Sequence, residues 1–128
     1  MNEQNYATLE ASKKLVDAGI VMETDFYWCY FDNPDFCLGQ RSKWEITSRS
    51  PTVEGVFPAP SMAEVWRELP EDITYHNERA EFYILKMDGE MITGYAIYEE
   101  AIHHTKNTNP TDALINLLIW VRKEASHD

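Results

Sequence analysis

The chain has only two cysteines, five glycines and eleven basic residues among its 128 residues. It also lacks a long apolar run, since no stretch approaches the roughly 20 apolar residues that a membrane-spanning helix needs. Residues 1–5 carry neither the basic head nor the apolar stretch of a signal peptide. We therefore expect a cytoplasmic protein that does not interact with a membrane.

The few cysteines and glycines argue against several kinds of site. Cys29 and Cys37 lack the C-x₂-C spacing of structural zinc sites, and the adjacent His103 and His104 point their side chains apart. Neither a glycine-rich phosphate loop nor a G-x-S-x-G nucleophile elbow occurs. We predict no metal, no cofactor and no catalytic residue. We expect the two cysteines to be unpaired, and a disulfide between them, if their strands fold back, stays open as an alternative. A composite metal site of Cys29, Cys37, His76 and His103 stays open as an alternative.

An apolar content of 44%, with four Trp, seven Tyr and five Phe, excludes a disordered chain. A chain of this length can bury a core without disulfides or metals. We see no repeat and no linker, and we predict that residues 1–128 form a single globular domain.

Local signals predict three helices, over 8–18, over 61–70 and from Asn109 onwards. Gly19 supplies a stop for the first helix. The second opens with a capping box of Ser61 and Glu64 and ends at Pro70, and the third has Pro110 after its N-cap. The predicted apolar face of the second helix is Met62, Val65, Trp66 and Leu69.

Strands are predicted over 25–31, 81–87 and 90–98, and 43–47 is expected to pair back on the first of them. Asp88-Gly89 is typical of a tight hairpin turn. We expect residues 99–104 to form a short irregular or helical link. Phe82, Ile84, Tyr95 and Ile97 are expected to point inward, although Tyr83 and Leu85 leave the choice of face open. The predicted fold class is α+β, a small and mainly antiparallel sheet of about four strands packed by three helices, in the order α-β-β-α-β-β-α.

The net charge of −11 is concentrated in residues 54–100, which carry eleven acids and three bases. Such a surface repels phosphate backbones, so we expect no direct nucleic-acid binding. The acids serve solubility, and they also suit a basic protein partner. The candidate interaction residues are Glu64, Glu68, Glu71 and Asp72, with Trp44 as an aromatic anchor in a locally basic stretch.

Three short motifs resemble small uncharacterised phage and prophage proteins of gut bacteria. They are the Pro-Ala-Pro step into a short helix at 58–70, the Asn-Pro-x-x-Ala-Leu helix start at 109–114, and the Leu-Glu-x-x-Lys-x-Leu helix that ends in a glycine at 9–19. These motifs are helix caps and core positions, and the family has no assigned activity. The resemblance implies an accessory protein that binds a component of the host or of a rival.

Two functions follow from these patterns. The favoured one is a non-enzymatic accessory protein of phage type that contacts a basic host or phage protein through an acidic surface. The alternative is a small-molecule binder or minor enzyme with an aromatic-lined pocket between the sheet and loop 32–57. Self-assembly is a third interpretation, because the sequence leaves the oligomeric state open.

Overall fold

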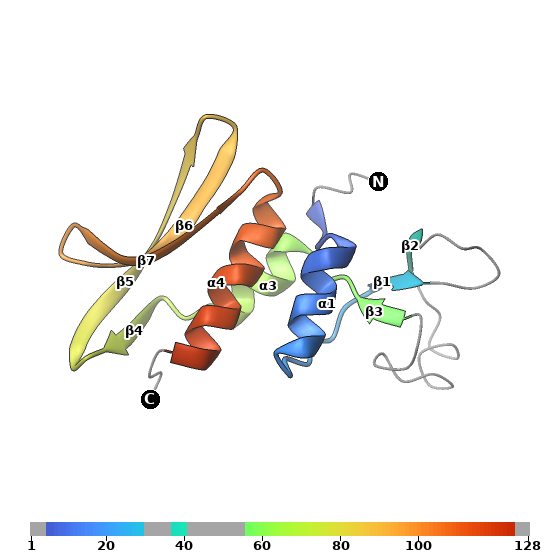
Figure 1. Ribbon diagram of the computed structural model, residues 1–128, viewed down its shortest axis with the longest axis horizontal. Helices are drawn as coiled ribbons and strands as arrows, with labels where there is room; N and C mark the ends of the chain where they lie inside the picture. Colours follow the sequence, from blue (N-terminus) through green and yellow to red (C-terminus); the bar gives the residue numbers. More distant parts are fainter. Residues whose placement is uncertain (1–4, 30–36, 41–55, 125–128) are drawn as a thin grey trace.

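The computed structural model describes residues 5–29, 37–40 and 56–124, which form helices and antiparallel strands (Figure 1). The predicted α+β class is confirmed. In chain order the elements are α1 (Leu9–Asp17), β1 (Phe26–Cys29), β2 (Cys37–Gln40), β3 (Val56–Pro58), α3 (Met62–Glu68), β4 (Asp72–Tyr75), β5 (Glu78–Met87), β6 (Glu90–Ile97), β7 (Glu100–Asn107) and α4 (Pro110–Glu124).

The strands form two sheets rather than the one that the sequence predicts. The larger sheet has the order β4-β5-β6-β7 and the smaller one has the order β2-β1-β3. Figure 1 shows α4 and α3 on one side of the larger sheet, then α1, and beyond α1 the smaller sheet. Within the described ranges, no helix or strand covers the opposite face of the larger sheet.

The larger sheet is a meander of successive hairpins. The expected turn at Asp88-Gly89 is confirmed, with φ angles of 53° and 79°. His76 and Asn77 also have positive φ angles, of 52° and 67°, and they join β4 to β5. Both turns twist in the sense that matches paired strands. The β4–β5 hairpin is not predicted from the sequence, because a His-Asn pair is a weaker turn signal than Asp-Gly.

The expectation for residues 99–104 is wrong, because they lie almost entirely in β7, which pairs with β6 from end to end. Between Tyr95 and Ala96 the register of β6 and β7 shifts, because β7 has one extra residue there, a bulge. This residue interrupts the alternation of side chains that would have indicated a strand. The predicted strand over 43–47 lies outside the described residues. In the smaller sheet β1 pairs instead with β2 and β3, and Cys29 is the backbone partner of Cys37.

Helix α4 forms the centre of the core, because its residues enter two packed clusters. Leu114, Ile115 and Leu118 pack with α1 and with Val65 of α3. Leu117 packs in the second cluster, against the inner face of the larger sheet. This explains why α4 is apolar nearly all round: it is buried between a helix layer and a sheet.

Trp66 is less buried than its place on the predicted apolar face of α3 suggests. Its side chain is 47% exposed and contacts the ring of Phe82 edge to face at 5.2 Å. Helix α3 is only seven residues long, so only Val65 becomes fully buried.

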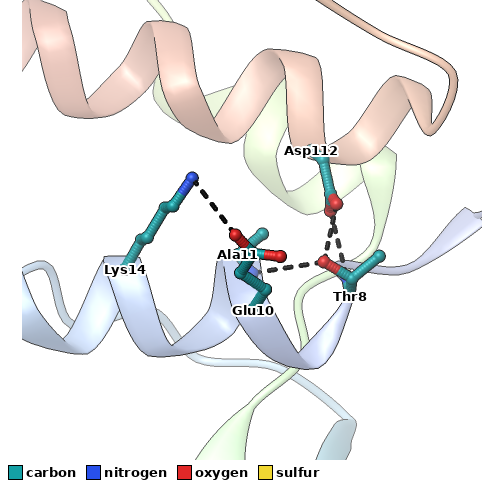
Figure 2. A network of polar contacts seen from close by, with 5 residues as sticks. All are labelled: Thr8, Glu10, Ala11, Lys14 and Asp112. Carbon is teal, nitrogen blue, oxygen red and sulfur yellow. Dashed lines mark hydrogen bonds and ion pairs between the residues drawn. The ribbon is translucent and has the colours of Figure 1, made fainter.

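Two helix starts are joined by a polar contact between residues far apart in the chain (Figure 2). Thr8 caps α1 by accepting a hydrogen bond from the Ala11 amide at 3.2 Å. The carboxylate of Asp112, in the first turn of α4, accepts hydrogen bonds from the amide and the hydroxyl of Thr8. Asn109 in turn accepts from the amide of Asp112 at 3.1 Å, which confirms Asn109 as the cap of α4.

None of the helices in the described part of the chain combines the length and the apolar character needed to cross a membrane.

Candidate functional site

Glu64, the first of the four candidate acids, is engaged inside the fold. Its carboxylate accepts hydrogen bonds of 2.8 Å from the Ser61 amide and from the Thr24 hydroxyl. The Ser61 hydroxyl accepts from the Glu64 amide, so the predicted capping box is confirmed. The Thr24 contact ties the start of α3 to the segment before β1, which is a structural role.

Two further candidate acids are paired with bases of the same chain. Glu68 lies 3.0 Å from Arg122 of α4, and Asp72 lies 2.9 Å from Arg79 of β5. Glu71 is exposed beside Asp72, and its backbone carbonyl accepts from the Phe82 amide. Trp44 lies outside the described residues, so its role as an anchor stays a prediction.

Two adjoining hollows lie at one end of the larger sheet, where β5 begins and the β6–β7 turn lies. One hollow there has a volume of about 710 Å³. A second hollow of about 690 Å³ adjoins it and shares Glu78, Ile97, Tyr98 and Glu99. The two adjoining hollows together are called the sheet-end groove. The charged residues and tyrosines around the two are Glu78, Arg79, Glu81, Tyr83, Tyr98, Glu99 and Glu100.

The sheet-end groove is strongly negative. Among the described residues around it the only base is Arg79, which is already engaged by Asp72 at 2.9 Å and lies 3.9 Å from Glu81. In the described part of the chain no ion pair holds Glu78, Glu99 or Glu100. Three unpaired carboxylates around one concave surface attract a cationic ligand.

Tyr98 stands at the rim of the sheet-end groove in an unusual conformation. Its side chain is 93% exposed, and its φ angle is 53°. Because Ile97 pairs with Glu100, Tyr98 and Glu99 form a two-residue turn. A left-handed conformation is rare for a bulky residue and costs on the order of 1 kcal/mol. The fold therefore presents a large aromatic ring to solvent at a position where glycine or asparagine would be less strained.

Another set of aromatic side chains is used for packing on the inner side of the sheet. Trp120 of α4 stacks on His103 at 4.3 Å and also contacts Tyr75 and Tyr95. The Tyr95 hydroxyl donates to the Pro70 carbonyl at 2.6 Å, and burial, with a smaller contribution from Asp72, raises the pKa of Tyr95 far above its usual value. These rings fill the space between α4 and the sheet.

The alternative pocket, between the sheet and loop 32–57, cannot be located because most of that loop lies outside the described residues. In the described part of the chain, no three His, Cys, Asp or Glu side chains come together as metal ligands. His76 lies in the β4–β5 turn and contacts Tyr75, whereas His103 lies against Trp120. The composite metal site therefore gains no support from these two histidines.

The groove as a site is not predicted from the sequence. Its acids are separated by up to 22 positions, and only the pairing of β5, β6 and β7 brings them together. The adjacent Glu99 and Glu100 were the available signal, but an acidic pair is common in a chain with 22 acids.

No protein-family model, no curated protein and no solved structure matches this chain. The resemblance to small phage and prophage proteins therefore stays a prediction.

Proposed function

We propose that this chain is a non-enzymatic accessory protein, of the phage type that its motifs resemble, which binds a basic protein partner in the sheet-end groove. The observation that carries the proposal is Tyr98. A fully exposed ring, held in a strained turn at the rim of a groove with three unpaired carboxylates, is suited to contact a lysine or arginine side chain.

The proposed surface consists of other residues than the four acids predicted from the sequence, although both sets lie within the acidic region 54–100. Glu64, Glu68 and Asp72 already bind groups of their own chain. A partner that used them would first have to break those contacts. Glu78, Glu99 and Glu100 can pair with a cation without that cost.

Tyr98 offers a test that separates function from stability. Tyr98→Asn relieves the left-handed strain, because asparagine tolerates that conformation better than tyrosine does. We expect the melting temperature to stay the same or rise, while partner capture falls. Tyr98→Phe keeps the ring and is expected to capture the partner like the wild type.

The partner is sought by affinity capture from nuclease-treated host lysate, read by mass spectrometry. The groove variant Glu78→Gln/Glu99→Gln/Glu100→Gln removes three charges from the sheet-end groove. The control variant Glu10→Gln/Asp17→Asn/Glu23→Gln removes three exposed charges near α1. We expect the wild type and the control to enrich the same basic protein and the groove variant to lose it. A protein captured equally by all three would refute the proposal.

A further inference from the structure

The open face of the larger sheet carries an apolar strip, where a solvated sheet face is expected to be polar. Ala80, Phe82, Thr93 and Tyr95 point toward the helices, so by alternation Tyr83, Leu85, Met87 and Ile92 point away from them. These last four residues form the outer strip. Leu85 is 50% exposed and Met87 is 53% exposed. An exposed apolar patch of this kind is informative, whereas a single exposed apolar residue is not.

The outer strip continues directly from the sheet-end groove. Tyr83 belongs to both, and along β5 the outward side chains are Glu81, Tyr83, Leu85 and Met87 in turn. On the neighbouring strand, Ile92 is the partner of Leu85. The seven residues from Glu81 to Met87 are six steps of extended chain, which give the line a length of roughly 20 Å.

The backbone of this face is closed to an added strand. Strands β5 and β6 are the two inner strands of the sheet and are paired on both sides. An extended segment laid across them would find no backbone groups to bond, and its own would stay unpaired. A helix satisfies its own backbone hydrogen bonds, and a helix is also what covers the inner face of this sheet.

The charges along the open face determine which end of a bound partner segment lies in the sheet-end groove. The sheet-end groove is acidic, whereas Lys106 and His104 of β7 lie beside Ile92 and Gly94. A basic helix end fits the groove and is repelled by Lys106 at the other end.

From these observations we propose that the partner binds as an amphipathic helix of about 13 residues, with its bases in the sheet-end groove and its apolar face on the outer strip. This inference rests on the proposed function, since the groove is the same site, and it adds the form and the orientation of the partner segment.

The test is a selection of random displayed peptides, about 16 residues long, on the immobilised full chain. The strip variant is Leu85→Ser/Met87→Ser, and its matched control is Val21→Ser, which replaces an apolar side chain that is 88% exposed. The groove variant is the triple glutamine change described above. Circular dichroism and melting temperature check that each variant is folded.

We expect the wild type and Val21→Ser to enrich peptides that have apolar residues at helical spacing and a basic cluster at one end. The strip variant should bind these peptides about tenfold more weakly or worse, as expected for loss of a central apolar contact. The groove variant should no longer enrich the basic cluster.

The possible failures distinguish the two proposals. Enriched peptides that are basic but have no apolar residues at helical spacing would contradict a helical partner and leave the proposed function standing. So would peptides that bind the strip variant as tightly as the wild type. The absence of any enrichment, or a basic cluster that persists on the groove variant, would overturn both.

Discussion

Asp112 in the first turn of α4 accepts two hydrogen bonds from Thr8, the residue that caps α1 104 positions earlier. The two distances are 2.9 Å from the amide and 2.6 Å from the hydroxyl. One carboxylate thus binds the start of a second helix while it lies near the positive end of its own. This contact fixes α1 against α4 at the edge of the core.

Removing the Asp112 carboxylate should destabilise the protein strongly. Hydrogen bonds to a charged group contribute about 1.5–3 kcal/mol each, so Asp112→Ala is expected to lower the free energy of unfolding by about 3 kcal/mol. Urea unfolding measures the change. In a double-mutant cycle with Thr8→Val, the two losses should be far from additive. Additive losses would mean that the two residues act independently.

Removing the hydroxyl of Ser12 should stabilise the protein. Its Oγ is buried and has no hydrogen-bond partner among the described residues. A buried hydroxyl without a partner costs about 1–3 kcal/mol, and alanine also favours the helix. We expect Ser12→Ala to raise the melting temperature by a few degrees. A clear fall would show that the hydroxyl has a partner.

Gly94 and Gly89 should respond differently to alanine. A Cβ at Gly94 would collide with the backbone carbonyl of His103 and meet the Tyr83 hydroxyl, whereas one at Gly89 meets open space. Gly94→Ala should cost about 3 kcal/mol by forcing β6 and β7 apart. Gly89→Ala should cost about 1 kcal/mol, from its positive φ angle alone. Equal losses in thermal unfolding would contradict the close pairing at Gly94.

His103 should make the protein less stable in mild acid. Burial against Trp120, and to a lesser extent the neighbouring charge of His104, lower the pKa of His103 in the folded protein. Protonation therefore favours the unfolded chain, where the histidine pKa is about 6.5. The stability that neutral His103 contributes is fully present above that pH and is lost as the pH falls below it.

The comparison variant is His103→Phe, which keeps a ring on Trp120 and cannot titrate. The stability of the wild type relative to this variant should fall as the pH is lowered from 7.5 to about 5. A difference that does not change with pH, or that rises in acid, would show that His103 is not neutral in the folded state.

The sequence predicts the local parts of this fold well. The capping box of Ser61 and Glu64, the stop at Gly19, the cap at Asn109 and the turn at Asp88-Gly89 are all confirmed. Each depends on atoms within a few residues of one another, so the sequence contains the whole signal.

Features that depend on distant partners were not predicted. The hydrogen bonds from Thr8 to Asp112 and from Thr24 to Glu64 join segments that are far apart in the chain. Only the packed fold brings these segments together. The sheet-end groove was missed for the same reason, because strand β7, with its bulge, was expected to be a link. From the sequence alone, Tyr83 and Leu85 leave the inward face of the β5–β6 hairpin undecided. The structure gives the reason, because this hairpin has apolar side chains on both faces.

Binding of a basic partner in the sheet-end groove is tested by the affinity of a defined probe, a helical peptide of alanine with several arginines at one end. We expect the wild type and the control variant Glu10→Gln/Asp17→Asn/Glu23→Gln to bind it equally. We expect Glu78→Gln/Glu99→Gln/Glu100→Gln to bind it about tenfold more weakly at low salt, since each exposed charge contributes about 0.2–1 kcal/mol. Equal losses in the two triple variants, or no binding to the wild type, would contradict a basic-partner site in the sheet-end groove.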